Sequence, residues 1–121
     1  MGKQILIVDD SPSMRQMVTF TLAEDGFEIV EADSGTAALD KLSGNNANLV
    51  ITDINMPGMN GIDLIKNIRS NDKHKFTPII VLTTESETAK QDEGKNAGAT
   101  AWLVKPFTPE KLKETVHKVV G

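Results

Sequence analysis

The stretch Leu49-Val50-Ile51-Thr52-Asp53 is an apolar run that ends in a carboxylate, and Ile54-Asn55-Met56-Pro57-Gly58 follows it. A short apolar run closed by a Pro-Gly turn is typical of a strand that is covered on both faces of a parallel sheet. Open α/β sheets bind their ligands at the carboxyl ends of the strands, so we expect Asp53 at a ligand-binding edge. Its role then depends on what the other strands bring to the same edge.

The composition places limits on the class of protein. The 121 residues fit one domain, residues 1–121, and 39% hydrophobic with 25% charged residues is typical of a soluble globular protein. No apolar run approaches the roughly 18 residues of a membrane helix, and the N-terminal run is too short for a signal peptide. With no cysteine, we expect a cytoplasmic protein without disulfides or thiol chemistry. A net charge of −4 argues against a nucleic-acid-binding surface, which needs clustered Lys and Arg.

Apolar runs alternate with amphipathic segments along the whole chain. We expect strands at residues 5–8, 27–31, 49–53, 78–83 and 101–105, and helices that begin near residues 12, 35, 61, 87 and 109. Strands that alternate with helices form right-handed βαβ units. The predicted fold class is therefore α/β, a flavodoxin-like (βα)5 three-layer sandwich with a parallel five-stranded sheet in the order 2-1-3-4-5.

The fourth predicted helix, residues 87–97, departs from this pattern. Residues 90–96 contain no large apolar side chain and include Gly94, which costs about 1 kcal/mol relative to Ala in a helix. We expect this helix to be the loosest element. His74, in a polar loop, and His117, on the last helix, are expected at the surface without a role.

Four of the predicted strands end in polar residues: Asp9-Asp10, Asp53, Thr83-Thr84 and Lys105. In the order 2-1-3-4-5 the first and third strands are neighbours, so their three acids converge. Such acids repel one another by about 4 kcal/mol per pair at a separation near 4 Å and an effective dielectric constant near 20. Each acid alone is equally well explained as a turn residue. Together they indicate a site for a hard divalent cation, Mg²⁺ above all.

Lys105 adds a function for this cluster. A fixed ammonium pairs with Asp53 in the resting state, and it can pair with a phosphoryl oxygen after Asp53 is modified.

The chain resembles the receiver domain of bacterial two-component response regulators from about residue 4 to residue 119. The resemblance rests on six motifs: Ile7-Val8-Asp9-Asp10, Asp53-Ile54-Asn55-Met56-Pro57, Gly61, Thr83-Thr84-Glu85, Ala97-Gly98-Ala99 and Leu103-Val104-Lys105-Pro106-Phe107. Within that family it is most similar to the chemotaxis regulators, through Ser13-Met14-Arg15, Asn55-Met56-Pro57 and Lys105-Pro106-Phe107-Thr108.

The resemblance implies a role for each site residue. Asp53 is the phosphoacceptor, which takes a phosphoryl group from a phosphohistidine of a sensor histidine kinase and becomes an aspartyl phosphate. Mg²⁺ is bound directly by Asp10, Asp53 and the backbone carbonyl of Asn55, and through water by Asp9. Lys105 and Thr83 contact the phosphoryl oxygens. Asn55 and Glu85 flank the path of the attacking water, which implies a short-lived signal.

The resemblance also implies a switch. The phosphoryl group draws the Thr83 hydroxyl inward, and the side chain at position 102 follows, which changes the surface of the fourth helix, fifth strand and fifth helix. The family usually has Tyr or Phe there, whereas this chain has the larger Trp102, whose N–H needs a partner. Trp102 either rotates inward or stays exposed as a partner contact. The fourth helix lacks the apolar residues that chemotaxis regulators present to the flagellar motor switch.

The predicted function is that of a stand-alone, monomeric response regulator in chemotaxis, with self-catalysed phosphoryl acceptance and autodephosphorylation but no turnover. Its expected partners are a sensor kinase and a downstream protein, with a phosphatase as a further candidate, and no nucleic acid or membrane. One alternative is an intermediate of another phosphorelay. A second is a small Mg²⁺-dependent phosphatase of the haloacid dehalogenase type, but that family needs an Asp where Asn55 stands. A flavodoxin is disfavoured because Asp9-Asp10 would repel the flavin phosphate.

Overall fold

In residues 3–84 and 91–120, which the computed structural model describes, five parallel strands form one sheet in the order β2-β1-β3-β4-β5. The strands are β1 Gln4–Val8, β2 Glu28–Ala32, β3 Leu49–Asp53, β4 Ile79–Thr84 and β5 Ala101–Lys105. The structure confirms the predicted flavodoxin-like topology, with sheet order 2-1-3-4-5.

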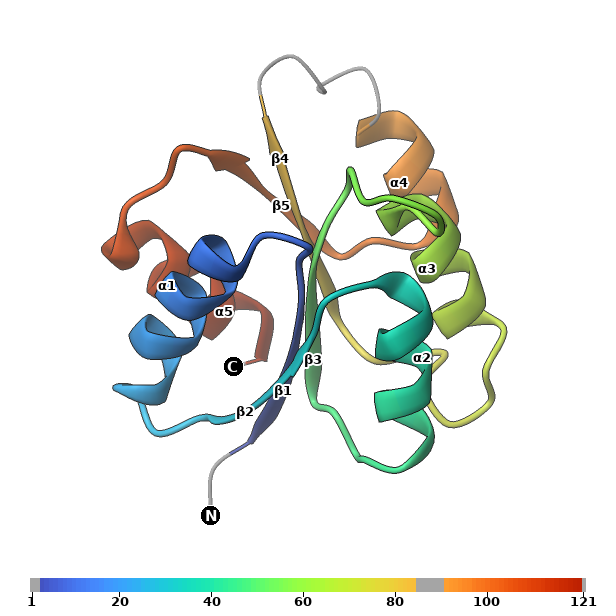
Figure 1. Cartoon of the computed structure of the whole chain (residues 1–121), viewed down its shortest axis with the longest axis horizontal. Helices are drawn as coiled ribbons and strands as arrows, with labels where there is room; N and C mark the ends of the chain where they lie inside the picture. Colours follow the sequence, from blue (N-terminus) through green and yellow to red (C-terminus); the bar gives the residue numbers. More distant parts are fainter. Residues whose placement is uncertain (1–2, 85–90, 121) are drawn as a thin grey trace.

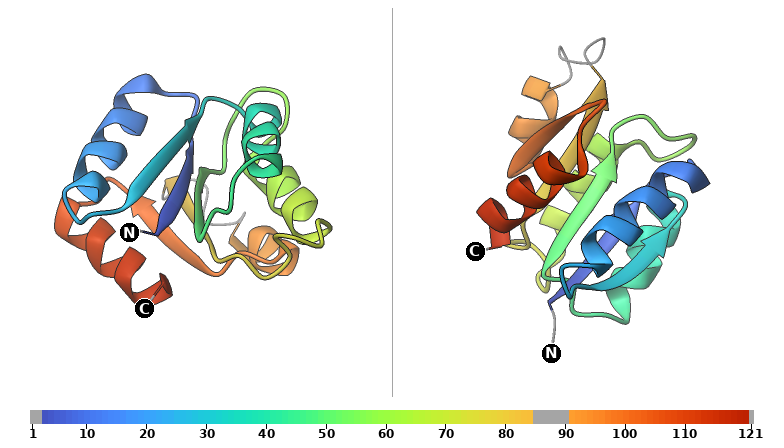
Figure 2. Two further views of the ribbon diagram at one scale, coloured as in Figure 1. Left: turned by 90° about the horizontal axis from the view of Figure 1, so that it is seen from below. Right: turned by 90° about the vertical axis from the view of Figure 1, so that its left-hand side faces the viewer.

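Helices cover both faces of the sheet and complete a three-layer sandwich (Figures 1 and 2). They are α1 Pro12–Ala23, α2 Gly35–Ser43, α3 Gly61–Arg69, α4 Gln91–Ala97 and α5 Pro109–Val120. Helices α1 and α5 lie on one face, and α2, α3 and α4 lie on the other. Among the described residues, none of these helices is both long and apolar enough to cross a bilayer.

The alternation of side chains along each strand divides the core into two clusters. In β3, Leu49 and Ile51 pack with residues of α1 and α5, whereas Val50 packs with residues of α2 and α3. Every residue of β3 is buried, including Asp53 at 7% exposure. A strand that is covered on both faces carries an almost continuous apolar sequence, which is why residues 49–53 were recognisable as this strand.

Gly61 sets the position of the carboxyl end of β3. Its N–H donates a hydrogen bond to the Ile54 carbonyl at 2.9 Å, and Asn60 caps the start of α3 by accepting from the Asp63 N–H at 2.9 Å. A Cβ at residue 61 would overlap the backbone carbonyl oxygen of Asp53. Only glycine lets α3 begin this close to the end of the strand.

Most element boundaries agree with the prediction to within one or two residues. The second strand begins at Glu28 and the fourth runs from Ile79 to Thr84, which is the usual uncertainty at element ends. The fourth helix is described from Gln91 onward, because residues 87–90 of its predicted range lie outside the described residues. That it is the loosest element stays a prediction.

The prediction that His74 lies at the surface was wrong. His74 is only 2% exposed, with Nε2 3.1 Å from the Leu42 carbonyl oxygen and Nδ1 3.3 Å from the Thr77 hydroxyl. Its loop folds back over the end of α2, where a carbonyl has no partner within the helix. His117 is exposed as expected, and its Nε2 lies 3.0 Å from Asp25 Oδ2.

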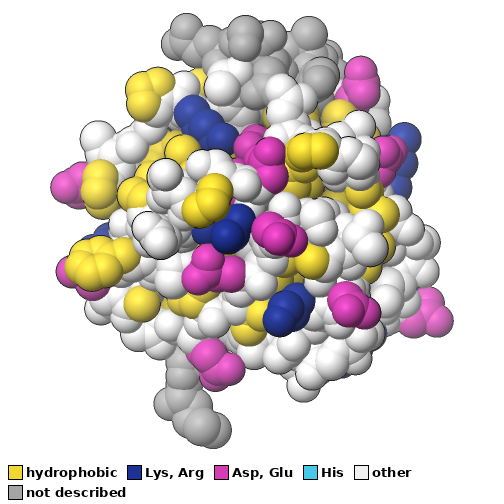
Figure 3. Space-filling model, viewed as in Figure 1, with side chains coloured by type: hydrophobic (Ala, Val, Ile, Leu, Met, Phe, Trp, Pro, Cys, Tyr) yellow, Lys and Arg dark blue, Asp and Glu magenta, His cyan; other side chains and the backbone are white. Residues whose placement is uncertain are grey.

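The surface of the described residues carries charges of both signs. On the face drawn in Figure 3, acidic and basic side chains are interspersed, with hydrophobic side chains between them. Among residues 3–84 and 91–120, two large hydrophobic side chains are well exposed, Phe20 at 71% and Phe76 at 87%.

Replacing Gly61 tests the close approach of α3 to β3. Alanine is the better helix former by about 1 kcal/mol, but the overlap with the Asp53 carbonyl should make Gly61→Ala less stable by about 1–3 kcal/mol. Urea unfolding measures the difference. The matched control is Gly44→Ala, where nothing lies within 4 Å of the added Cβ, and it should stay within about 0.5 kcal/mol of wild type. A Gly61→Ala protein as stable as wild type would contradict the packing argument.

Candidate functional site

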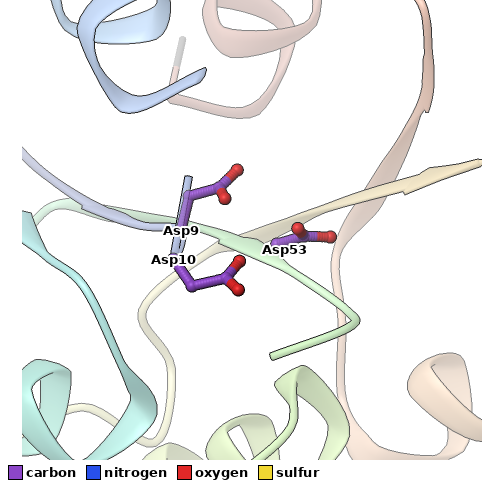
Figure 4. A group of neighbouring side chains, drawn as sticks. All are labelled: Asp9, Asp10 and Asp53. Carbon is purple, nitrogen blue, oxygen red and sulfur yellow. The ribbon is translucent and has the colours of Figure 1, made fainter. Parts of the chain in front are cut away.

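Three carboxylates meet at the carboxyl edge of the sheet, as Figure 4 shows. One carboxylate oxygen from each of Asp9, Asp10 and Asp53 lies within 4.8 Å of the others. In the register of β1 and β3, Val8 lies opposite Thr52, so the next residues of the two strands, Asp9 and Asp53, reach the same level of the edge. The predicted convergence of the three acids is confirmed.

Lys105 reaches this cluster from the end of β5. Its Nζ lies 3.1 Å from Asp53 Oδ2 and 3.9 Å from Asp9 Oδ2, and its side chain is 19% exposed. Leu103, two residues before Lys105 in β5, packs in the hydrophobic cluster between the sheet and helices α1 and α5. Ile51, two residues before Asp53 in β3, packs in the same hydrophobic cluster. Lys105 and Asp53 therefore lie on the same face of the sheet, and the predicted resting-state ion pair is present.

Asp9 is the most deeply buried of the three acids, with no exposed surface. Its Oδ1 accepts a hydrogen bond from the Ser11 N–H at 2.9 Å, while Oδ2 is buried without a hydrogen-bond partner among the described residues. Burial raises the pKa of Asp9, and the charges of Asp53 and Asp10 raise it further; the Ser11 hydrogen bond and the Lys105 charge oppose the shift.

The donor set of this cluster fits a hard divalent cation. Three carboxylates and one ammonium leave an excess of negative charge, and Asp9 Oδ2 is a buried acceptor that still needs a partner. All the available ligand atoms are oxygens, which Mg²⁺ prefers. The Asn55 N–H lies 3.4 Å from Asp53 Oδ1, so the backbone of Asn55 is close to the cluster as well. The individual roles of Asp9, Asp10, Asp53 and Asn55 as ligands stay predictions.

Thr83 lies on the other face of the sheet. It is fully buried, and its hydroxyl donates to the Thr84 carbonyl at 3.2 Å. Val81, two residues earlier, lies opposite Trp102 in β5, and both pack against the cluster beside α2 and α3. The alternation of β4 thus places Thr83 on the same face as Trp102.

Trp102 is partly buried in this conformation. Its rotation on activation stays a prediction, as does the alternative that it contacts a partner in both states. Glu85, the other residue expected to influence hydrolysis, lies outside the described residues.

One residue at the site was not predicted from its chemistry. The Arg15 guanidinium donates to the backbone carbonyl of Asp9 at 2.7 Å, although Arg15 entered the sequence comparison only as part of a motif. The sequence feature that could have indicated this contact is a basic residue in the first turn of a helix that directly follows a pair of acids.

The family model of the response regulator receiver domain matches residues 5–117. The chain belongs to the response regulator receiver family. It is therefore a signalling regulator and not a conventional turnover enzyme.

Known proteins support this assignment over almost the whole chain. The chain is 44% identical over 120 residues to the chemotaxis protein CheY1 of Helicobacter pylori, which covers 98% of this chain and 97% of that protein. It is 41% identical over 117 residues to the chemotaxis protein CheY of Pseudomonas aeruginosa, with 96% and 94% covered. Among solved structures, the chemotaxis response regulator CheY4 of Vibrio cholerae matches with a TM-score of 0.93 at 46% identity, covering 98% of both chains.

The pKa shift of Asp9 predicts a pH-dependent stability in metal-free buffer. Because folding raises the Asp9 pKa above its ordinary value of 3.8, ionised Asp9 destabilises the folded state, and this cost appears as pH rises from 3.8 through the folded-state pKa. Asp9→Asn should therefore melt at a higher temperature than wild type at neutral pH, and the difference should shrink as pH falls toward 3.8. Thermal melts across this range measure it.

Asp40→Asn, an exposed change on α2, serves as the control and should follow the wild-type profile. A lower melting temperature of Asp9→Asn at neutral pH without metal would contradict the assignment of Asp9 as a destabilising buried charge.

Proposed function

We propose that this receiver accepts a phosphoryl group on Asp53 from the phosphohistidine of a sensor histidine kinase, and that the modified protein signals by binding a downstream protein in chemotaxis. The observation that carries the proposal is the contact of 3.1 Å between Lys105 Nζ and Asp53 Oδ2 beside two further acids. It joins a carboxylate to a cation that can transfer its contact to a phosphoryl oxygen.

Of the three acids, Asp53 is the best placed to react. Asp9 has no exposed surface and cannot reach a donor, whereas the Asp53 side chain is 10% exposed at the end of a buried strand. Asp10 is exposed but lies in a turn and has no ion pair among the described residues. Asp53 thus combines access with a fixed position, which phosphoryl transfer depends on.

In the transfer, a carboxylate oxygen of Asp53 forms a bond to phosphorus while the phosphorus–nitrogen bond of the donor breaks and the imidazole leaves. Lys105 moves from Asp53 toward a phosphoryl oxygen, and Thr83 donates its hydroxyl to another. A bound Mg²⁺, held by Asp10, Asp53 and the Asn55 carbonyl with Asp9 through water, would supply neutralisation of the phosphoryl charge. Water later attacks phosphorus and releases phosphate, and we expect the residue types at positions 55 and 85, Asn55 and Glu85, to set the rate of this step.

In this proposal, phosphorylation changes the structure on the β4–β5 side of the sheet. Because Thr83 and Trp102 share one face, a displaced Thr83 hydroxyl opens space next to the partly buried indole. Trp102 then moves and changes the surface formed by α4, β5 and α5, which we propose as the binding site of the downstream protein. We further propose that the regulator works as a cytoplasmic monomer without binding nucleic acid.

Chemotaxis is supported by the relatives at 41–44% identity that carry the name chemotaxis protein. Disruption of the gene distinguishes this pathway from another phosphorelay. Loss of directed swimming supports chemotaxis, and normal swimming with a different defect favours the other phosphorelay.

Phosphorylation at Asp53 is tested by treating the protein with acetyl phosphate and Mg²⁺ and measuring its mass. Wild type should gain one phosphoryl group in the presence of Mg²⁺ and none when Mg²⁺ is left out of the reaction. Asp53→Asn should gain none in either case. Asp40→Asn, which removes an exposed acid of α2, is the matched control and should behave as wild type.

The same samples test the switch, because Trp102 is the only tryptophan of the sequence. Beryllofluoride with Mg²⁺ should change its fluorescence in wild type but not in Asp53→Asn. An equal mass gain in wild type and Asp53→Asn would contradict the assignment of the phosphoacceptor, and an unchanged wild-type spectrum would contradict the coupling to Trp102.

A further inference from the structure

Arg15, in the first turn of α1, binds the turn that carries Asp9 and Asp10. Its Nη1 donates to the Asp9 carbonyl oxygen at 2.7 Å, and its Nε donates to Glu31 Oε1 at 3.2 Å. Its own N–H donates to the Ser11 carbonyl at 3.0 Å. The side chain is 19% exposed, so the bond to Asp9 is largely shielded from water. One residue thus holds the turn through both its backbone and its side chain.

The other contacts of this turn leave Asp10 to be placed by its backbone. The Asp9 N–H donates to the Ala32 carbonyl at 3.1 Å, and the Ser11 N–H donates to Asp9 Oδ1 at 2.9 Å. Among the described residues, no hydrogen bond or ion pair holds the Asp10 side chain. The peptide group between Asp9 and Asp10 is planar, so a fixed Asp9 oxygen also fixes the direction of the Asp10 N–H and the position of its Cα. By binding the Asp9 carbonyl, the guanidinium of Arg15 therefore helps to fix the position from which the Asp10 side chain extends.

We propose that Arg15 is a positioning residue for the cation site: it orients the peptide between Asp9 and Asp10 so that the Asp10 carboxylate points toward Asp53, and Glu31 holds the guanidinium in place. The inference rests on the proposed Mg²⁺ site. Arg15 forms no ion pair with Asp9, Asp10 or Asp53 among the described residues, so its effect passes through the backbone carbonyl of Asp9.

A positioning role and a simple charge effect of Arg15 predict opposite changes in Mg²⁺ affinity when Arg15 is removed. Arg15 places a positive charge close to the acids, and that charge repels a cation. Removing it would tighten Mg²⁺ binding if charge alone mattered. Removing a group that orients a ligand weakens metal binding, by about tenfold or more for outer groups of known metal sites.

The Mg²⁺ dissociation constant of the full chain, measured by isothermal titration calorimetry, separates the two effects. Arg15→Ala should weaken Mg²⁺ binding by about tenfold. Arg15→Lys should weaken Mg²⁺ binding less than Arg15→Ala does. A lysine ammonium can still donate to the Asp9 carbonyl, but it lacks the planar set of N–H groups with which the guanidinium also binds Glu31. Lys41→Ala is the matched control, since Lys41 lines the same hollow of about 270 Å³ as Arg15 and Glu31. Among the described residues, no hydrogen bond or ion pair joins its side chain to the turn of Asp9 and Asp10. Lys41→Ala should bind Mg²⁺ as tightly as wild type or more tightly.

A second readout does not depend on metal. In metal-free protein, hydrogen exchange of the Ser11 amide should be faster in Arg15→Ala than in wild type, because that amide donates to Asp9 Oδ1 within the same turn. Exchange in α3, which lies on the other face of the sheet, should be unchanged.

The outcomes distinguish this inference from the proposed function. If wild type binds Mg²⁺ and Arg15→Ala binds it equally or more tightly, the positioning role is overturned while the proposed function stands. If wild type does not bind Mg²⁺, the proposed function itself fails. Should Arg15→Ala not fold, Arg15→Lys decides, and wild-type affinity in that variant overturns the positioning role.

Discussion

The repulsion among the carboxylates of Asp9, Asp10 and Asp53 is the constraint on which the rest of the structure depends. Their oxygens lie within 4.8 Å of one another, and the ammonium of Lys105 contacts Asp53 at 3.1 Å and Asp9 at 3.9 Å. Among the described residues, Lys105 is the one cation that forms ion pairs with these acids, since Arg15 pairs with Glu31, and the cluster is therefore short of positive charge. This deficit fits the binding of a divalent cation at a site whose ligand atoms are oxygens. The buried strand β3 and the turn after β1 hold the acids together against their repulsion.

The parallel sheet separates the residues of the proposed site into two groups, one on each face. Asp53 and Lys105 lie on the face covered by α1 and α5, whereas Thr83 and Trp102 lie on the face covered by α2, α3 and α4. In the proposed switch, a change at Asp53 reaches the other face through the end of β4. β4 lies between β3 and β5 in the sheet and pairs with both the strand of Asp53 and the strand of Trp102.

Much of the fold, and the convergence of the acids, could be predicted because both depend on the residue types of the strands and their ends. β3 is buried on both faces and so is apolar from Leu49 onward, and parallel strands end at one edge. The residues that escaped prediction bind backbone carbonyls: Arg15 that of Asp9, His74 that of Leu42, and Arg69 those of Thr77 and Gly98. Every residue has a backbone carbonyl, so the pattern of side chains in the sequence does not predict which carbonyl a distant Arg or His binds.

The melting temperature of Asp10→Asn with and without Mg²⁺ tests the carboxylate repulsion most directly. Asp10 is the exposed acid of the cluster, so its replacement removes a charge with little change in packing. In metal-free buffer, Asp10→Asn should melt above wild type by about 2–5 °C, because one source of repulsion is gone. Mg²⁺ should raise the melting temperature of wild type clearly and that of Asp10→Asn much less. A melting temperature of Asp10→Asn below that of wild type in metal-free buffer would contradict the account.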